Sequence, residues 1–221
     1  MSDEGVLLVE GASDVDFFGA LLPSLALDRP VKICPPRDYG RHNTVTVVPA
    51  LVPHLIRQLD TQSITRLAIV VDADHDSGGG FQPRWDQVTA ALRAEGYRCP
   101  QRPPREPNQG SLFQHDDGLP AVGLWLLPNH RDNGMLEDLV LATAARVPPQ
   151  GALLDHAAEA IQGLPHTLFS DHHRSKALTY SWLSYQARPA IGLSAPLRAG
   201  LLDQASPSLR GLCDWLVRAL G

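Results

Sequence analysis

A run of five apolar residues, Leu67 to Val71, constrains the fold more than any other stretch, because acidic residues follow it at once. A short apolar run rich in Val and Ile is typical of a strand buried on both faces, as in a parallel sheet covered by helices. Asp72, Asp74 and Asp76 follow at intervals of two residues. If the chain stays extended, Asp72 and Asp74 point to the same side, about 6.5–7 Å apart.

In open α/β sheets, ligands bind in the crevice outside the carboxyl ends of the strands, where this pair of carboxylates would lie. Two such charges about 5 Å apart repel by ~3 kcal/mol at an effective dielectric constant of about 20. A divalent cation removes that repulsion, and carboxylate oxygens suit Mg²⁺ or Mn²⁺. The alternative is an acidic turn that caps the next helix, and the two aspartates alone do not decide between these readings.

The composition is that of a globular protein. The chain has 221 residues, 43% hydrophobic and 19% charged, which suits one large domain or one domain with an extension. It lacks both an apolar run of about 18 residues and a basic N-terminal segment, so we expect a cytoplasmic protein without a membrane span. The net charge of −5 argues against non-specific coating of nucleic acid, and three scattered cysteines argue against a zinc site or disulfide framework.

Glu10 directly follows a second predicted strand at residues 6–9. Ser13 and Asp16 form a capping-box pattern, which predicts a helix start with Asp14 in its first turn. Asp14 and Asp16 are explained by this position alone, because acids stabilise a helix N-terminus. Nothing local requires an acid at Glu10, which makes it the better functional candidate.

The remaining elements give an α/β pattern. Further strands are expected at residues 31–34 and 123–127, with residues 111–115 paired to the latter through a turn at 116–118. Helices are expected at about residues 48–60, 84–95, 152–161, 170–185 and 209–220. The chain is therefore interpreted as an α/β domain at residues 1–148, with about four mainly parallel strands, an edge hairpin and flanking helices. A helical extension at residues 149–221 would pack on it as one compact unit.

Two groups of charged residues lie at predicted helix starts. Glu137 and Asp138 are either first-turn acids or ligands. The basic group is His172, His173, Arg174 and Lys176. The helix dipole disfavours cations at this end, so they form either a solvated face or a contact to phosphate or substrate.

The order strand–Glu–Gly, strand–Asp–x–Asp, further strand and acidic helix start resembles the Toprim domain of topoisomerases, bacterial primases, small nucleases and OLD-type nucleases. The first two motifs are Leu7-Leu8-Val9-Glu10-Gly11-Ala12-Ser13-Asp14 and Ile69-Val70-Val71-Asp72-Ala73-Asp74. Residues 126–129 and 134–139, together with Lys176 and Trp182-Leu183-Ser184-Tyr185, resemble small stand-alone OLD-like Toprim proteins of the DUF3226 type. OLD proteins couple this domain to an ATPase, and the chain has no GxxxxGK[ST] loop, so an ATPase or other protein partner would be separate.

The resemblance implies a Rossmann-like Toprim fold and two-metal hydrolysis of phosphodiester bonds. Glu10 and Asp14 would hold one Mg²⁺ or Mn²⁺, Asp72 would lie between the two metals, and Asp74 and Glu137 would complete the second site. Asp76 would be an additional ligand at the same spacing. Lys176 would stabilise the phosphate transition state, so the implied catalytic residues are Glu10, Asp72, Asp74 and Lys176. Five carboxylates facing two divalent cations leave one negative charge, which Lys176 can neutralise.

Arginines on predicted loops are candidates for contacts to a nucleic-acid backbone; the alternative is that most of them are simply solvated. They are Arg37, Arg41, Arg102 and Arg105.

We expect a metal-dependent nuclease acting on DNA or RNA, in defence or repair, because hydrolysis needs the fewest additional parts. One alternative is a non-catalytic or partner-dependent Toprim module that binds metal or nucleic acid without turnover. Another takes the DxD as the metal site of a nucleotide-sugar or phosphomonoester enzyme on an unrelated α/β fold. Glu10 and Lys176 in the same crevice as Asp72 would favour the nuclease over this last alternative.

Overall fold

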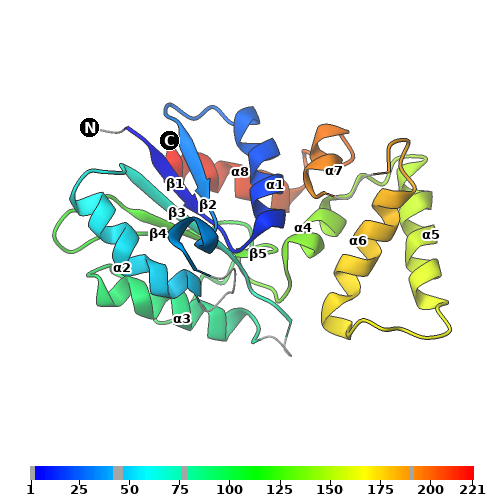
Figure 1. Cartoon of the computed structure of the whole chain (residues 1–221), viewed down its shortest axis with the longest axis horizontal. Helices are drawn as coiled ribbons and strands as arrows, with labels where there is room; N and C mark the ends of the chain where they lie inside the picture. The colour runs from blue at the N-terminus through cyan, green and yellow to red at the C-terminus, as the bar shows by residue number, and fades with distance from the viewer. Residues whose placement is uncertain (1–2, 42–46, 76–78, 190–191) are drawn as a thin grey trace.

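The computed structural model describes residues 3–41, 47–75, 79–189 and 192–221, and its centre is a five-stranded sheet between two layers of helices (Figure 1). The strands are β1 (Gly5–Leu8), β2 (Val31–Cys34), β3 (Arg66–Asp72), β4 (Ser111–Phe113) and β5 (Val122–Leu127). Their order is β2-β1-β3-β5-β4; four strands are parallel, and β4 runs antiparallel to β5 at the edge. The predicted α/β class, the mainly parallel sheet and the edge hairpin are confirmed, and the architecture is Rossmann-like.

One face of the sheet is covered by α2 (Val47–Asp60) and α3 (Phe81–Ala94). Leu8, Ile69 and Leu126 point to this face and are completely buried against the two helices. The start of α3 is fixed from outside the helix, because the Phe81 N–H donates to Asn133 Oδ1 at 2.7 Å.

The other face is covered by α1 (Ala12–Leu21), α4 (Leu136–Thr143) and α8 (Pro207–Leu220). Alternate strand residues point to it, among them Leu7, Val70 and Trp125. Burying one side chain of this kind contributes about 1.5–3 kcal/mol, and burial on both faces explains why β3 reads as a continuous apolar run.

The C-terminal third is helical, as predicted, but its last helix belongs to the α/β layers. Helices α5 (Gln150–Gln162) and α6 (Arg174–Ser184) form a hairpin beside α4, at the far end of the molecule from β4, and the short helix η4 (Asp171–His173) precedes α6 (Figure 1). The chain then passes α7 (Ser194–Arg198), which packs on α1, and returns as α8 against β1, β3 and β5. The indole rings of Trp215 on α8 and Trp125 on β5 lie 5.5 Å apart.

In the part of the chain that the structure describes, no helix has both the length and the apolar character to cross a membrane. All three cysteines are free thiols.

Candidate functional site

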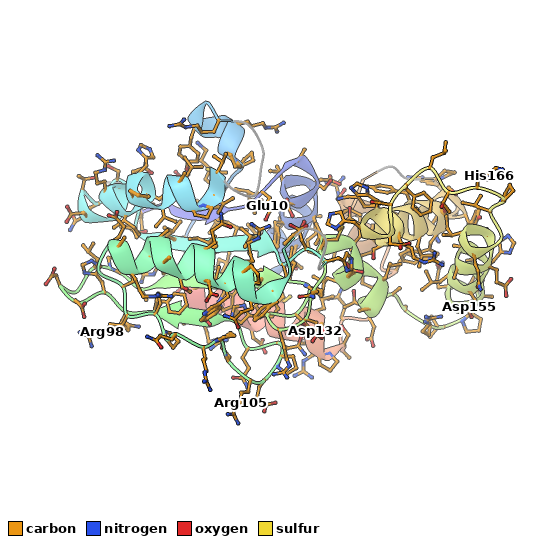
Figure 2. The ribbon with its side chains drawn as sticks, turned by 90° about the horizontal axis from the view of Figure 1, so that it is seen from below. Glu10, Arg98, Arg105, Asp132, Asp155 and His166 are labelled. Carbon is orange, nitrogen blue, oxygen red and sulfur yellow. The ribbon has the colours of Figure 1, made fainter. Side chains whose placement is uncertain are left out.

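A crevice of about 190 Å³ opens at the carboxyl ends of β1 and β3. It lies between the N-terminal ends of α1 and α4 and the first turn of α6. Its lining residues are Glu10, Gly11, Ala12, Ser13, Asp14, Asp72, Leu136, Glu137 and Lys176. Figure 2 shows Glu10 in the middle of the molecule, between the α/β layers and the α5–α6 hairpin that carries Asp155 and His166. We call this feature the acid crevice.

Glu10 and Asp72 lie side by side because their strands are adjacent and parallel. The pairing of β1 with β3 matches Leu8 with Ile69, so both strands deliver their terminal acids to the same edge. The Asp72 N–H donates a hydrogen bond of 2.9 Å to Glu10 Oε1. The structure thus brings together the two acids that the sequence singled out most strongly.

Asp14 enters the acid crevice from the start of α1. The helix begins two residues earlier than the capping-box pattern indicated: the N-cap is Gly11, and Asp14 Oδ2 accepts its N–H at 2.8 Å. Asp16, predicted to complete a box with Ser13, instead accepts the Ser194 N–H of α7 at 2.8 Å. The predicted cap at Ser13 is therefore wrong, because Asp14 makes the capping contact and Asp16 is used by a distant element.

Two neighbouring acids at the start of α4, Glu137 and Asp138, have different roles. Asp138 Oδ2 accepts the N–H of the N-cap residue, Met135, at 2.8 Å, and thus has the structural role that the sequence allowed for both acids. Glu137 instead lines the acid crevice and is 1% exposed. The N–H of Leu136, the first residue of α4, donates to Asp72 Oδ1 at 3.0 Å. This hydrogen bond connects α4 to the end of β3.

Lys176 is the one basic side chain among the described residues that line the acid crevice. Its Nζ lies 3.3 Å from Glu137 Oε1, an oxygen that is fully buried and accepts no hydrogen bond of good geometry. Two of the basic residues at and before the start of α6 thus face acids: Lys176 faces Glu137, and His172 Nε2 lies 3.7 Å from Asp74 Oδ1.

Asp74 lies beside the acid crevice but is not among its lining residues. The extended geometry assumed for Asp72 and Asp74 stops at the end of β3, because Asp74 has a φ of 62° and bonds Gly134 through its main chain. Its Oδ2 accepts from Arg84 Nη2 at 2.7 Å. The same guanidinium donates through Nε to the Asp72 carbonyl at 3.1 Å. The structure therefore gives Asp74 a protein cation as its partner, where the sequence suggested a metal.

A second acid, Asp138, contacts a histidine and a serine. Asp138 Oδ2 lies 3.4 Å from His75 Nε2, and Asp138 Oδ1 accepts from the Ser175 hydroxyl. Glycine is needed at position 134, where φ is 141° and an added Cβ would lie 2.8 Å from Asp138 Oδ2. We call Asp74, His75, Arg84, Asp138 and His172 the ion-paired flank. Asp76, the additional ligand suggested by the sequence, lies outside the described residues.

Burial and mutual repulsion favour protons on the acids of the crevice. Burial, and then the charge of Asp14, raises the pKa of Glu10 to about 8. Burial raises the pKa of Asp14 to about 6, and burial together with Glu10 raises the pKa of Asp72 well above its ordinary range. Burial would lower the pKa of Lys176, but the carboxylates of Glu137 and Asp72 outweigh it and raise that pKa.

The acids do not form a finished metal cage. Among the described residues, no three His, Cys, Asp or Glu side chains converge closely enough to hold an ion by themselves. Hydrogen bonds explain why the carboxylates do not converge: one oxygen each of Glu10, Asp14 and Asp72 accepts a main-chain N–H. Mg²⁺ does not need such a cage, since it keeps several waters and is commonly held by one or two carboxylates plus substrate phosphate.

Two contributors were missed by the sequence analysis. Arg84 gives no sequence signal, because its partners, at the end of β3 and just after it, lie ten or more positions away and are met only through the fold. His130 is buried near the end of β5, where Nδ1 accepts the Leu126 N–H at 3.0 Å and Nε2 pairs with the Ser111 hydroxyl at 2.9 Å. Burial lowers the pKa of His130 to about 3, so it is a neutral structural group.

The four arginines proposed for nucleic-acid contacts fall on two sides. Arg102 and Arg105 line a groove near β5. Arg41 lines a hollow with Tyr39 and His54 beside α2, and Arg37 lies in the short helix η2 (Pro36–Tyr39) after β2.

The fold and the acid crevice define an α/β protein with a candidate cation site at the carboxyl edge of its sheet. A family described as a protein of unknown function (DUF3226) matches residues 4–221, and the chain belongs to this family. No curated protein and no solved structure gives a match.

Proposed function

We propose that the protein is a Toprim-type, OLD-like nuclease that uses Mg²⁺ or Mn²⁺ to hydrolyse phosphodiester bonds of nucleic acid. One observation carries the proposal: four carboxylates from four separate elements share a crevice with Lys176 at the carboxyl edge of the sheet. These are positions that the Toprim resemblance assigns to the site.

The acid crevice has a side that suits a cation and a side that suits an anion. Glu10, Asp14, Asp72 and Glu137 supply the first. Lys176 and the first N–H groups of α1, which have no preceding helical carbonyl as partner, supply the second. A phosphodiester accompanied by a divalent cation requires both sides in one place, which a purely structural acid cluster would not provide.

The donor set suits Mg²⁺ or Mn²⁺, because every oxygen donor is a carboxylate. Among the described residues, the buried Glu137 Oε1 accepts no well-formed hydrogen bond, and with Lys176 Nζ 3.3 Å away it still has a lone pair for a cation. Glu10, Asp14, Asp72 and Glu137 would hold the ion, which when bound supplies an activated water and charge for the leaving oxygen. Asp74 could join them only by releasing Arg84.

The protein groups then have separate tasks. Lys176 places a positive charge next to the acids, where it can bind a non-bridging phosphate oxygen and stabilise negative charge that develops there. The α1 amides at Ala12 and Ser13 orient the same phosphate. Glu10, with its raised pKa, holds a proton at neutral pH and loses it when a cation enters.

The alternative enzyme class is less favoured. A DxD site on an unrelated fold predicts that Glu10 and Lys176 point elsewhere, whereas both line the crevice with Asp72. A non-catalytic or partner-dependent Toprim module would have the same geometry, so only an assay separates it from the nuclease.

The test is a cleavage panel with purified protein, Mg²⁺ or Mn²⁺, and supercoiled plasmid, single-stranded DNA and RNA. We expect cleavage of at least one substrate, its abolition by EDTA, and its loss in Asp72→Ala and Glu10→Gln variants. Asp155→Asn, an exposed acid on α5, is the matched control and should retain full activity. Cleavage that survives Asp72→Ala would place the activity elsewhere, and no cleavage with or without an added ATPase partner would favour the non-catalytic module.

A further inference from the structure

A second hollow lies on the β5 side of the sheet, outside the acid crevice. It is a groove of about 450 Å³ between the start of α3, the loop before β4 and the loop after β5. Its charged lining residues are Arg102, Arg105, Arg131 and Asp132, and Pro103 and Pro104 form part of its wall. We call it the arginine groove.

The side chains of the three arginines of this groove are exposed and have no partner among the described residues. Within the described part of the chain, none makes an ion pair or a side-chain hydrogen bond, whereas Arg29, Arg84, Arg98 and Arg146 each pair with an aspartate. The one acid in the groove, Asp132, accepts from the Asn129 amide at 2.7 Å. The lining therefore carries three positive charges against one negative charge, in a chain whose net charge is −5.

The loop that carries Arg102 and Arg105 is fixed at its base. The Asn108 N–H donates to the Asn129 carbonyl at 2.7 Å, and Arg218 of α8 donates to the Gln109 carbonyl. Gly110 has a φ of 61° and packs so closely on Trp215 that a Cβ would lie 2.2 Å from the indole. A loop held in this way presents its arginines at a reduced entropic cost on binding.

The arginine groove and the acid crevice share the carboxyl edge of the sheet. Arg131 lies on the connection that leaves β5 and reaches Glu137 six residues later, so one short segment contributes to both features. Strands β1 and β5 are separated by β3 alone, and two strand spacings are about 10 Å. Figure 2 shows Arg105 on the outside of its loop and Asp132 on the neighbouring one, whereas the paired Arg98 lies toward the opposite end of the body.

We propose that the arginine groove binds the sugar–phosphate backbone of a single nucleic-acid strand whose neighbouring phosphate occupies the acid crevice. The inference rests on the proposed function for the identity of that second phosphate. Arginines suit phosphate through their planar, bidentate donors, and Pro103 and Pro104 provide apolar surface for sugars and bases. Backbone contacts position a strand without reading its sequence.

The test measures binding in EDTA, where no metal-dependent cleavage occurs and the cation site is not used. A fluorescein-labelled 20-nucleotide single strand is titrated with wild type, with the triple variant Arg102→Ala/Arg105→Ala/Arg131→Ala, and with Arg98→Ala/Arg146→Ala/Arg188→Ala. The second variant removes the same charge from exposed positions outside the groove. We expect the groove variant to bind at least about tenfold more weakly and to lose about 2 from the slope of log K against log salt, since each phosphate contact contributes about 0.7. The control should bind within twofold of wild type.

Equal binding by the groove variant and wild type would overturn the inference, as would a mononucleotide that competes as well as the 20-mer. Thermal melting of each variant checks that it is folded, and Arg105→Ala alone, at an exposed site, replaces the triple variant if that one is not. If binding depends on the groove but no substrate is cleaved, the inference stands and the nuclease proposal fails. If cleavage is seen and ignores the groove arginines, only the inference fails.

Discussion

The acid crevice and the ion-paired flank lie on either side of the end of β3, and both collect acids, but they balance charge differently. In the flank, Asp74 faces Arg84 and Asp138 faces His75. In the crevice, four carboxylates share Lys176. The flank acids thus have protein partners of their own and belong to the fold. The crevice leaves its excess charge to protons or to a bound cation, and this difference distinguishes a candidate functional site from a structural one.

The largest expected effect is on the crevice side. Asp72→Asn keeps the oxygen that accepts the Leu136 N–H but removes a negative charge from the cation side. We expect metal-dependent cleavage to fall about 10³-fold, at the upper end of the loss from deleting one electrostatic contact in an active site. Metal-free stability should be unchanged or higher, because a repelled buried charge is gone. Initial rates and urea unfolding measure the two effects, with Asp155→Asn as the control.

Lys176→Met keeps the apolar stem and removes the ammonium group next to Glu137. We expect the maximal cleavage rate to fall about 10²-fold, with Mg²⁺ affinity unchanged or tighter, because a positive charge has left the crevice. Lys32, the other lysine of the chain, lies exposed on β2, so Lys32→Met is the matched control. An unchanged rate would show that the lysine only neutralises Glu137.

On the flank side, Asp74→Asn should change stability more than chemistry. It leaves the Arg84 guanidinium, which is 6% exposed, without its charge partner. Breaking a fully buried pair costs about 3–5 kcal/mol, and because Asp74 is 16% exposed we expect a loss of about 2 kcal/mol in unfolding free energy. Urea titration measures it, and a double-mutant cycle with Arg84→Met isolates the pair. If Asp74→Asn had wild-type stability but no cleavage activity, Asp74 would be a metal ligand, as the sequence suggested. The distinction between a functional crevice and a structural flank would then fail.

The smallest expected effect is a pH dependence confined to the crevice. The pKa of Glu10 is about 8 in the folded protein against an ordinary value of 4.5, so the folded state holds a proton that the unfolded chain has lost. Metal-free stability should therefore fall as pH rises from 6.5 to 8.5, by about 1 kcal/mol after allowance for partial exposure. The buried His130 titrates below this window when folded, and its unfolded-state pKa lies at the window's lower limit, so it contributes little.

Melting temperatures in EDTA at pH 6.5, 7.5 and 8.5 test this slope, and Mg²⁺ should raise the melting temperature most at pH 8.5, where it competes with the fewest protons. Glu10→Gln should reduce the slope but not abolish it, because burial still raises the pKa of Asp72, whereas Glu159→Gln on α5 should leave the profile unchanged. A wild-type profile that rises with pH in EDTA would contradict the raised pKa of Glu10.

Much of this arrangement could be predicted from the sequence, because strand ends are local features. The apolar run before Asp72 and the one before Glu10 mark neighbouring parallel strands, and parallel strands deliver their last residues to one edge. The contribution of Glu137 and Lys176 to the same crevice followed from the resemblance and agrees with the structure.

The remainder depends on contacts that local patterns do not contain. The left-handed turn at Asp74 separates it from Asp72, and it is stabilised by a main-chain pairing with Gly134, sixty residues later. The choice of Arg84 as partner depends on how α3 packs against β3. The shift of the α1 cap from Ser13 to Gly11 reflects competition between two equally spaced acids, which α7 resolves by binding Asp16.

The central claim is that the acid crevice binds a divalent cation, and anomalous diffraction from crystals grown with Mn²⁺ tests it most directly. The account predicts an anomalous peak about 2.0–2.3 Å from carboxylate oxygens of Glu10 and Asp72, absent from Asp72→Asn crystals. A crevice without a peak at saturating Mn²⁺, or a peak only at the ion-paired flank, would contradict it.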